Sequence, residues 1–383
     1  MQADVTRLML ALIRAELAET PLPEHERALL TPPIMQELYA LSKAHDEAHL
    51  VACALDRLGL LDGEDPVAEQ FEKQQTLAFF RNRQAERETQ RIFSLFEELQ
   101  IPYIPLKGTV LKQAYPSGWL RTGCDVDILV RQEDLERAAE ALTERLSYTC
   151  EGTMWHDVSL HSPDGLHVEL HFALIDTVRF PLVSEILSTV WQDAERCAPD
   201  RYLFSLSREH FLLYHVAHTA KHFLIGGCGI RPFWDLRIME TRLGYRIEDH
   251  EALLERAGML KFARAEHALA EVFAGVREHD DLTRSMEDYV VRAGVYGTME
   301  NRTVNQLAKS GKLRFTLSRL ILPFDQLKKQ YPVLEKHRAL SPLMQVHRWF
   351  RCIFSGNGRV RDVLHTKNRQ IRDTASLMNA LGI

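Results

Sequence analysis

The stretch Cys-Asp-Val-Asp-Ile-Leu-Val, residues 124–130, constrains the fold more than any other part of the chain. Its composition is that of a buried β-strand, yet it carries two aspartates one residue apart. Successive side chains of a strand point to opposite faces, so Asp125 and Asp127 share one face while the apolar residues between and after them face a core. Because an ionised carboxylate is costly to desolvate unless it is paired, we expect a cation on the polar face of this strand.

A second strand with the same alternation lies at residues 166–174, where Glu169 and His171 share a face. A Pro-Asp-Gly turn precedes it and predicts a hairpin with the strand-like residues 157–162. If this strand neighbours the first, Glu169 joins the two aspartates in a cluster of three carboxylates. Hard oxygen ligands of this kind select Mg²⁺ or Mn²⁺. An Asp-x-Asp pair alone is more often a loop or a cap, so the interpretation depends on Glu169.

Upstream of the aspartates, Leu-Lys-Gly-Thr-Val-Leu at residues 106–111 is a candidate phosphate-binding turn. A glycine that enters a helix lets backbone N–H groups approach a phosphate, and the helix dipole favours the anion. Taken alone, Gly108 is better explained as an ordinary turn before a helix. Next to a divalent-metal site within about twenty residues, the same turn suits a nucleoside triphosphate.

The bulk sequence argues against several classes of protein. The six cysteines form no Cys-x-x-Cys pair, which disfavours a zinc knuckle or a disulfide framework and favours reduced thiols in a cytoplasmic protein. Charged residues interrupt the apolar N-terminus at helical spacing, as in an amphipathic helix rather than a signal peptide. No run of 18 uncharged apolar residues occurs, which argues against a membrane span.

Local patterns divide the chain into three parts. Residues 1–100 are rich in helix formers, residues 101–180 alternate short strands with helices, and residues 181–383 are again helical. We therefore expect an α+β fold in which a small mixed β-sheet core is flanked by N-terminal and C-terminal helical regions.

The net charge of −6 is unevenly distributed, because residues 301–383 carry +12 and the remainder −18. The basic segment predicts an anionic partner, which is a nucleotide phosphate, a nucleic acid or an anionic membrane surface. Alternatively, its basic helix faces complement the acidic body. Residues 346–354 interleave Arg348 and Arg351 with aromatic residues, which suits nucleic-acid stacking or a membrane interface. An amphipathic helix packed on its own domain explains the same residues, and we favour that reading.

The order Lys-Gly-Thr, Arg121, Asp-Val-Asp-Ile-Leu-Val and Glu-Leu-His resembles the polymerase-β-like nucleotidyltransferase superfamily. More closely, it resembles a bacterial branch of uncharacterised nucleotidyltransferases. The sharp part of the resemblance covers residues 104–171. Two departures are a Gly-Thr pair where Gly-Gly or Gly-Ser is common, and a glutamate where the third carboxylate is usually an aspartate.

The resemblance implies transfer of a nucleoside monophosphate from an NTP to an acceptor hydroxyl by a two-metal mechanism. It implies that Asp125 and Asp127 bridge two Mg²⁺ (or Mn²⁺) ions and that Glu169 holds the metal that activates the acceptor. It further implies that Gly108 and Thr109 bind the β- and γ-phosphates, with Lys107 as a nearby charge.

Arg121, four residues before the metal pair, either clamps a phosphate or forms a structural ion pair. Further on, Arg231 and Asp235 could pair with each other, or Asp235 could shape the acceptor pocket. Trp234 stacks on a base or, as we prefer, belongs to the core.

Residues 210–223 predict a helix on which His215, His218 and His222 form one stripe. A zinc site is possible at this spacing, but no acidic ligand is near in sequence, and polar histidines at an interdomain surface are the commoner explanation. In the resembled branch this helix lies against the active site. Lys221 and His222 are therefore the best candidates for phosphate or base contacts.

The acceptor is left open between a small molecule, a protein side chain and an RNA 3′ end. An alternative function is a non-catalytic nucleotide-binding or interaction module, such as a component of a toxin–antitoxin or phage-defence pair. A metal-dependent hydrolase that uses the same carboxylates is a third hypothesis.

Overall fold

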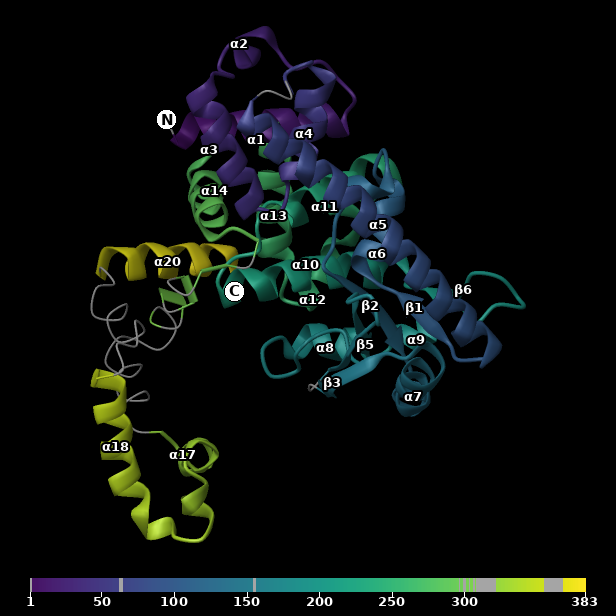
Figure 1. Ribbon diagram of the computed structural model, residues 1–383, viewed down its shortest axis with the longest axis vertical. Coiled ribbons are helices and arrows are strands. Elements are labelled where there is room, and N and C mark those ends of the chain that lie inside the picture. The colour runs from purple at the N-terminus through teal and green to yellow at the C-terminus, as the bar shows by residue number, and fades with distance from the viewer. Residues whose placement is uncertain are drawn as a thin grey trace.

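The computed structural model describes residues 2–61, 65–153, 156–295, 297–298, 301–302, 304–305, 307, 322–354 and 368–383. Within them a small mixed sheet is flanked by helices that precede and follow it, which confirms the expected α+β class (Figure 1). The sheet has the strand order β1-β2-β5-β4-β3. Its strands are β1 (Tyr103–Pro105), β2 (Asp125–Val130), β3 (Thr149–Thr153), β4 (Asp157–His161) and β5 (His167–His171).

Strands β2 and β5 are parallel neighbours, and Asp127 lies directly opposite Glu169. The other neighbouring pairs of the sheet are antiparallel. The predicted hairpin of β4 and β5 is present, and Gly165 in its turn has a φ of +82°, a conformation that glycine adopts without strain. The strand with two aspartates and the strand with Glu169 are therefore adjacent, as the interpretation required.

One face of the sheet is apolar. Residues such as Ile128 and Leu170, which alternate with the polar ones, are fully buried against α5 (Pro66–Glu98) and α7 (Leu135–Leu146). Burial of each such side chain stabilises the fold by about 1.5–3 kcal/mol. Because a strand that holds these side chains in the core must turn the intervening ones outward, the polar residues of β2, β4 and β5 all face the opposite side.

The helices before and after the sheet share a second apolar core. In Figure 1 the N-terminal helices lie against α11, α13 and α14. The division of the chain into residues 1–100, 101–180 and 181–383 remains a proposal. The first and third of these regions share this core. The helices that contribute to it are α1 (Gln2–Leu17), α3 (Pro32–Ala44), α4 (Ala48–Arg57), α8 (Pro181–Leu187), α10 (Arg208–Ile225), α11 (Arg231–Leu243), α12 (Glu251–Arg256), α13 (Leu260–Phe273), α14 (Asp281–Ala293) and α20 (Asn368–Leu381).

Helix α5 connects the two cores, because Phe71 near its start belongs to the helical core and Phe96 near its end to the sheet core. Its start is capped by Asp65, whose side chain accepts a hydrogen bond from the backbone N–H of Val67. The remaining short elements are α2 (Glu24–Arg27), α6 (Lys107–Leu111), α9 (Val190–Asp193), β6 (Glu195–Arg196) and β7 (Phe204–Ser205).

Helices α17 (Phe324–Gln330) and α18 (Ser341–Phe354) pack around a small apolar cluster of their own and lie apart from the other elements in Figure 1. On α18 Arg348 is buried, whereas Leu343 and Phe350 are exposed. Packing within the chain thus covers only part of this helix, and the anionic partner of the basic segment stays a prediction. Residues 308–321 and 355–367 of that segment lie outside the described residues. Among the described helices, each is too short or too polar to cross a bilayer.

Candidate active site

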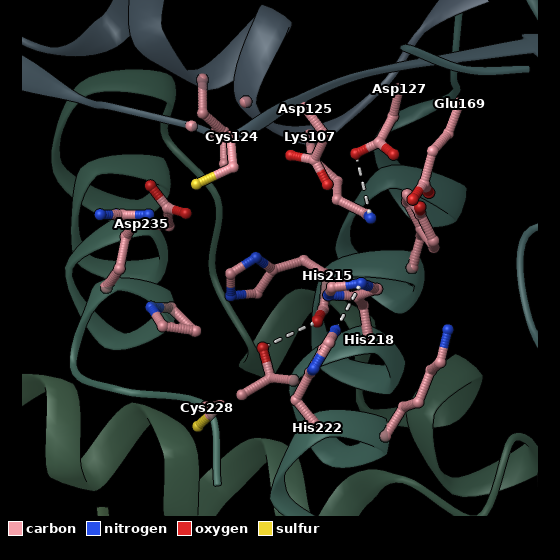
Figure 2. Close-up of a pocket in the computed structure, with 18 of the residues that line it drawn as sticks. Lys107, Cys124, Asp125, Asp127, Glu169, His215, His218, His222, Cys228 and Asp235 are labelled. Carbon is pink, nitrogen blue, oxygen red and sulfur yellow. Dashed lines mark hydrogen bonds and ion pairs between the residues drawn. The ribbon is translucent and has the colours of Figure 1, made fainter. Parts of the chain in front are cut away.

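A cleft of about 590 Å³ opens between the polar face of the sheet and helix α10. Figure 2 shows the sheet side chains Asp125, Asp127 and Glu169 on one side of it, with Lys107 among them. The histidines of α10 approach from the opposite side. All nine site residues named from the sequence line this cleft, and they are Lys107, Gly108, Thr109, Arg121, Asp125, Asp127, Glu169, Lys221 and His222.

Among Asp125, Asp127 and Glu169, Asp127 is the most enclosed, with 5 % of its surface exposed. Its Oδ2 lies 3.1 Å from Nζ of Lys107, and its Oδ1 lies 2.9 Å from Nε2 of His171. Burial opposes ionisation, but these two cations hold the pKa of Asp127 well below its usual range. Asp127 is therefore ionised at neutral pH.

The other two carboxylates lie beside Asp127. Glu169 Oε2 is 3.2 Å from the same Nε2 of His171, and this hydrogen bond lowers the pKa of Glu169 against the effect of burial. Asp125 is exposed at the mouth of the cleft, and the charge of Asp127, followed by desolvation, raises its pKa. Ligand atoms of Asp127, Glu169 and His171 lie within 4.8 Å of one another. The predicted convergence of acidic side chains from two adjacent strands is thus present.

His171 links the two carboxylates and is itself buried. Burial alone would lower its pKa, but the hydrogen bonds to Asp127 and Glu169 outweigh it and raise the pKa to about 8. The sequence analysis put His171 on the polar face and gave it no role, although its place on the same face as Glu169 was visible in the Glu-Leu-His spacing.

Lys107 enters the cleft from the first residue of α6. Its φ of +37° lies in the left-handed region, which is uncommon for a residue with a side chain. The ammonium group lies 5.5 Å from the ring centroid of Tyr214 on α10 and is paired with Asp127. Burial would lower the pKa of Lys107, but the charge of Asp127, the neighbouring Tyr214 and Asp125, and the hydrogen bond to Asp127 together outweigh it and raise the pKa. The lysine thus stays charged inside the cleft.

Arg121 forms a bidentate ion pair with Asp235 of α11, at 2.9 Å from Nε to Oδ1 and 2.8 Å from Nη2 to Oδ2. The hydroxyl of Tyr115 donates to the same Oδ1 at 2.8 Å. The ion-pair interpretation of Arg121 is therefore present in the structure. The remaining Nη1 lies against Gly108, where a Cβ would clash with it. Arg121 thereby connects the turn of residues 106–111 to α11.

Arg231 does not pair with Asp235, contrary to one of the sequence alternatives. It binds the turn between α3 and α4, at 2.8 Å to Asp46 Oδ2 and 2.9 Å to Glu47 Oε1. The pairing residues are 185 and 184 positions apart, and no local pattern predicts them. The N-terminal helices thus contribute Asp46 to the lining of the cleft. Trp234 is buried beside Phe273, in agreement with the core interpretation.

The three histidines of the α10 stripe have different surroundings. His215 is directed at the buried Glu266 of α13, 3.2 Å away, and therefore belongs to the helix interface. His218 and His222 face the cleft, with their Nε2 atoms 3.0 Å apart. Burial, aided by Lys107, lowers the pKa of His222 to about 4 and that of His218 well below its usual value. Both are neutral imidazoles at physiological pH, next to Lys221.

The polar face of the sheet and the Lys-Gly-Thr turn of residues 107–109 line the same cleft, and together they define a class of protein. A small mixed sheet that presents acidic side chains from neighbouring strands toward such a turn is the arrangement of an α+β nucleotidyltransferase. The chain belongs to the family described as "Uncharacterised nucleotidyltransferase", whose sequence model matches residues 33–275. It is accordingly a nucleotidyltransferase enzyme.

Comparison with individual proteins adds little to the family assignment. No curated protein matches the chain. Among solved structures, the chain is similar to the solution structure of the antibiotic-resistance factor ANT(2'')-Ia, with 14% sequence identity and a TM-score of 0.33. That match covers 51% of this chain and 100% of the other. A likeness this distant assigns neither a substrate nor a mechanism to this chain.

Proposed function

We propose that this enzyme transfers a nucleoside monophosphate from an NTP to an acceptor hydroxyl in a Mg²⁺-dependent reaction. The observation that carries the proposal is the register of β2 and β5, which sets Asp127 opposite Glu169 at a cleft that also holds Lys107. Because NTPs and Mg²⁺ are cytoplasmic, we expect the reaction to take place there.

The donor set fits a divalent metal. Asp125, Asp127 and Glu169 offer carboxylate oxygens on one polar face, which Mg²⁺ or Mn²⁺ prefers over nitrogen ligands. These residues would hold the metal, which when bound supplies charge neutralisation at the phosphates and a lowered pKa for the acceptor hydroxyl. The low pKa of Asp127 keeps this ligand ionised and ready to bind.

The basic residues of the cleft suit the triphosphate. Lys107, which neutralises Asp127 in the protein alone, is placed to contact a phosphate beside the metal-binding carboxylates. Gly108 and Thr109 follow it and line the same cleft, and Lys221 faces them from α10. We assign to these residues the β- and γ-phosphates, and to Nη1 of Arg121 a supporting contact. His222 is a candidate for a base or phosphate contact.

The proposal is tested with the purified protein, α-labelled NTPs, Mg²⁺ and a cell extract that supplies acceptors. The wild type is expected to transfer label to an acceptor, and Asp127→Asn to reduce this transfer by about 100-fold or more, because one charged group of the metal site is lost. The matched control is Glu133→Gln, which removes an exposed carboxylate just beyond β2 and is expected to keep full transfer.

Two outcomes would overturn the proposal. Label recovered only as free nucleoside monophosphate, with no labelled acceptor, indicates a hydrolase. Binding of NTP without transfer or hydrolysis, across all four NTPs and several extracts, indicates a non-catalytic module. Identification of the labelled species by mass spectrometry decides between a small molecule, a protein side chain and an RNA 3′ end.

A further inference from the structure

A second group of ligand-type side chains adjoins the carboxylates and shares His171 with them. It consists of His156, Asp157 at the start of β4, and His171 at the end of β5, with ligand atoms within 4.8 Å of one another. The antiparallel register of β4 and β5 sets Asp157 directly opposite His171. This group contains two imidazoles and one carboxylate, unlike the all-oxygen set of the proposed magnesium site.

The orientation of His171 leaves one ring nitrogen for this second group. Nε2 lies near Asp127 Oδ1 and Glu169 Oε2, which only accept hydrogen bonds, so Nε2 carries a hydrogen. The opposite nitrogen, Nδ1, is buried and has no hydrogen-bond partner among the residues that the structure describes. His171 itself is 2 % exposed. A cation bound at Nδ1 would take the place of the second ring proton that the imidazolium form carries there, while Nε2 keeps its hydrogen toward the two carboxylates.

Asp157 also has a buried side-chain atom that lacks a hydrogen-bond partner among the described residues. Its side chain is 6 % exposed, and its Oδ1 is buried with no hydrogen-bond partner within the described part of the chain. Nδ1 of His156 lies 3.5 Å from this oxygen, which is longer than a normal hydrogen bond. Buried polar atoms in proteins are nearly always satisfied, so the neighbouring unsatisfied Nδ1 of His171 and Oδ1 of Asp157 call for a shared partner.

We propose that His156, Asp157 and His171 bind a divalent transition metal of the zinc class. Two imidazole nitrogens with one carboxylate oxygen are a ligand set that Zn²⁺ accepts, with a further position for water, and that Mg²⁺ disfavours. Metal-bound histidines commonly donate their other ring N–H to a carboxylate, which is the relation of His171 to Asp127 and Glu169. The metal would thereby fix the ring of His171, and with it the positions of both carboxylates.

The test uses the full-length protein, stripped with a chelator and titrated with Co²⁺ as a spectroscopic substitute for Zn²⁺. The wild type is expected to bind one equivalent and to develop the visible absorption of Co²⁺ in a low-coordinate site with nitrogen ligands. Asp157→Ala and His156→Ala are each expected to weaken binding at least tenfold and to remove this absorption. His161→Ala is the matched control, since it removes another histidine from the same hairpin but leaves the three ligands.

Several results would overturn the proposal. One is the absence of Co²⁺ absorption in the wild type, and another is a loss of Co²⁺ binding in His161→Ala as large as in the ligand variants. A third is Co²⁺ binding that is lost in Asp125→Ala but kept in Asp157→Ala, which would assign the ion to the carboxylate site. Circular dichroism of each variant identifies any that fails to fold, and Asp157→Asn then replaces Asp157→Ala. Because binding is measured without NTP, failure here leaves the proposed transfer reaction intact, and absence of transfer leaves the metal site intact.

Discussion

Lys107 illustrates how one side chain serves both the fold and the proposed chemistry. In the protein alone it neutralises Asp127, which would otherwise be a buried anion held by His171 alone. A triphosphate and its metal would change the partners on both sides of this pair. The lysine is thus placed where stability of the protein and affinity for the nucleotide depend on the same ammonium group.

We predict that Lys107→Met lowers the free energy of unfolding by about 2 kcal/mol, because Asp127 loses one of its two charged partners. The affinity for NTP is expected to fall about tenfold, which corresponds to about 1.4 kcal/mol. Urea denaturation and nucleotide binding by calorimetry measure the two effects. Lys112→Met, which removes a lysine five residues later with no contact to Asp127, serves as the control. Unchanged values in Lys107→Met would contradict the role given to this residue.

Gly108 permits the close approach of Arg121 to the turn of residues 106–111. We predict that Gly108→Ala displaces Nη1 of Arg121 and destabilises the protein by about 1–3 kcal/mol, as overpacking of a tight contact does. Transfer activity is expected to fall as well. In Gly118→Ala the new methyl group would meet its nearest atom, the backbone oxygen of Lys112, at an ordinary 3.7 Å, so this control should stay close to the wild type. Thermal denaturation of both variants checks the difference.

At the scale of elements, the alternation within β2 and β5 was predictable from the sequence and the partners of the charged residues were not. The period of two is local, so it places Asp125 and Asp127 on one face of their strand and Glu169 on the polar face of its own, and the Pro-Asp-Gly turn predicts the hairpin. That the two strands are neighbours was a condition of the interpretation, which the structure supplies. Arg121 and Asp235 are 114 residues apart in the sequence. Arg231 pairs with residues that precede the sheet, 184 positions earlier for Glu47. Helix packing determines which carboxylate pairs with which arginine, and no local pattern in a single sequence predicts these pairs.

Register also explains the ligand group that the sequence analysis missed. Asp157 falls opposite His171 only because β4 and β5 pair around the turn in one particular way. The hairpin itself was predicted, but the pairing of Asp157 with His171 also requires the strand ends to be known to within one residue, and the sequence does not define them that accurately. A shift by one position would have turned Asp157 toward the core.

Two buried histidines join the α3–α4 region to other elements and predict a pH dependence. His49 Nε2 lies 2.8 Å from the backbone oxygen of Leu120, and His45 Nε2 lies 3.2 Å from that of Val291. Burial lowers the pKa of each to about 4, whereas in the unfolded chain it is near 6.5. Between these values the unfolded state binds more protons, so stability falls as the pH falls from about 6.5 to 4.

The expected loss at pH 5 is about 2 kcal/mol for each histidine relative to neutral pH. We predict that His49→Gln, which no longer titrates, shows a shallower decline of unfolding free energy between pH 7 and 5 than the wild type. The surface variant His25→Gln should follow the wild-type slope, because that side chain is exposed. Parallel slopes for all three proteins would show that His49 is not held neutral in the folded state.

At the scale of the whole molecule, the N-terminal and C-terminal helices form one cooperative unit with a shared core. We predict that Leu12→Ala in α1, a fully buried position, costs about 2–5 kcal/mol. It should also speed hydrogen exchange in α10 and α13, far away in sequence. Leu343→Ala on α18, at a position 59 % exposed, should change stability by no more than about 0.5 kcal/mol. Faster exchange confined to the N-terminal helices would instead indicate independent units.

The shared core has a consequence for synthesis of the protein on the ribosome. Helix α4 ends about 150 residues before α10 begins, so the first helices emerge long before the partners that cover their apolar faces. At elongation rates of about 5–20 residues per second this interval is about 8–30 s. During that time the nascent chain exposes hydrophobic surface that its own later segments will bury. Overproduction should therefore benefit from added chaperones.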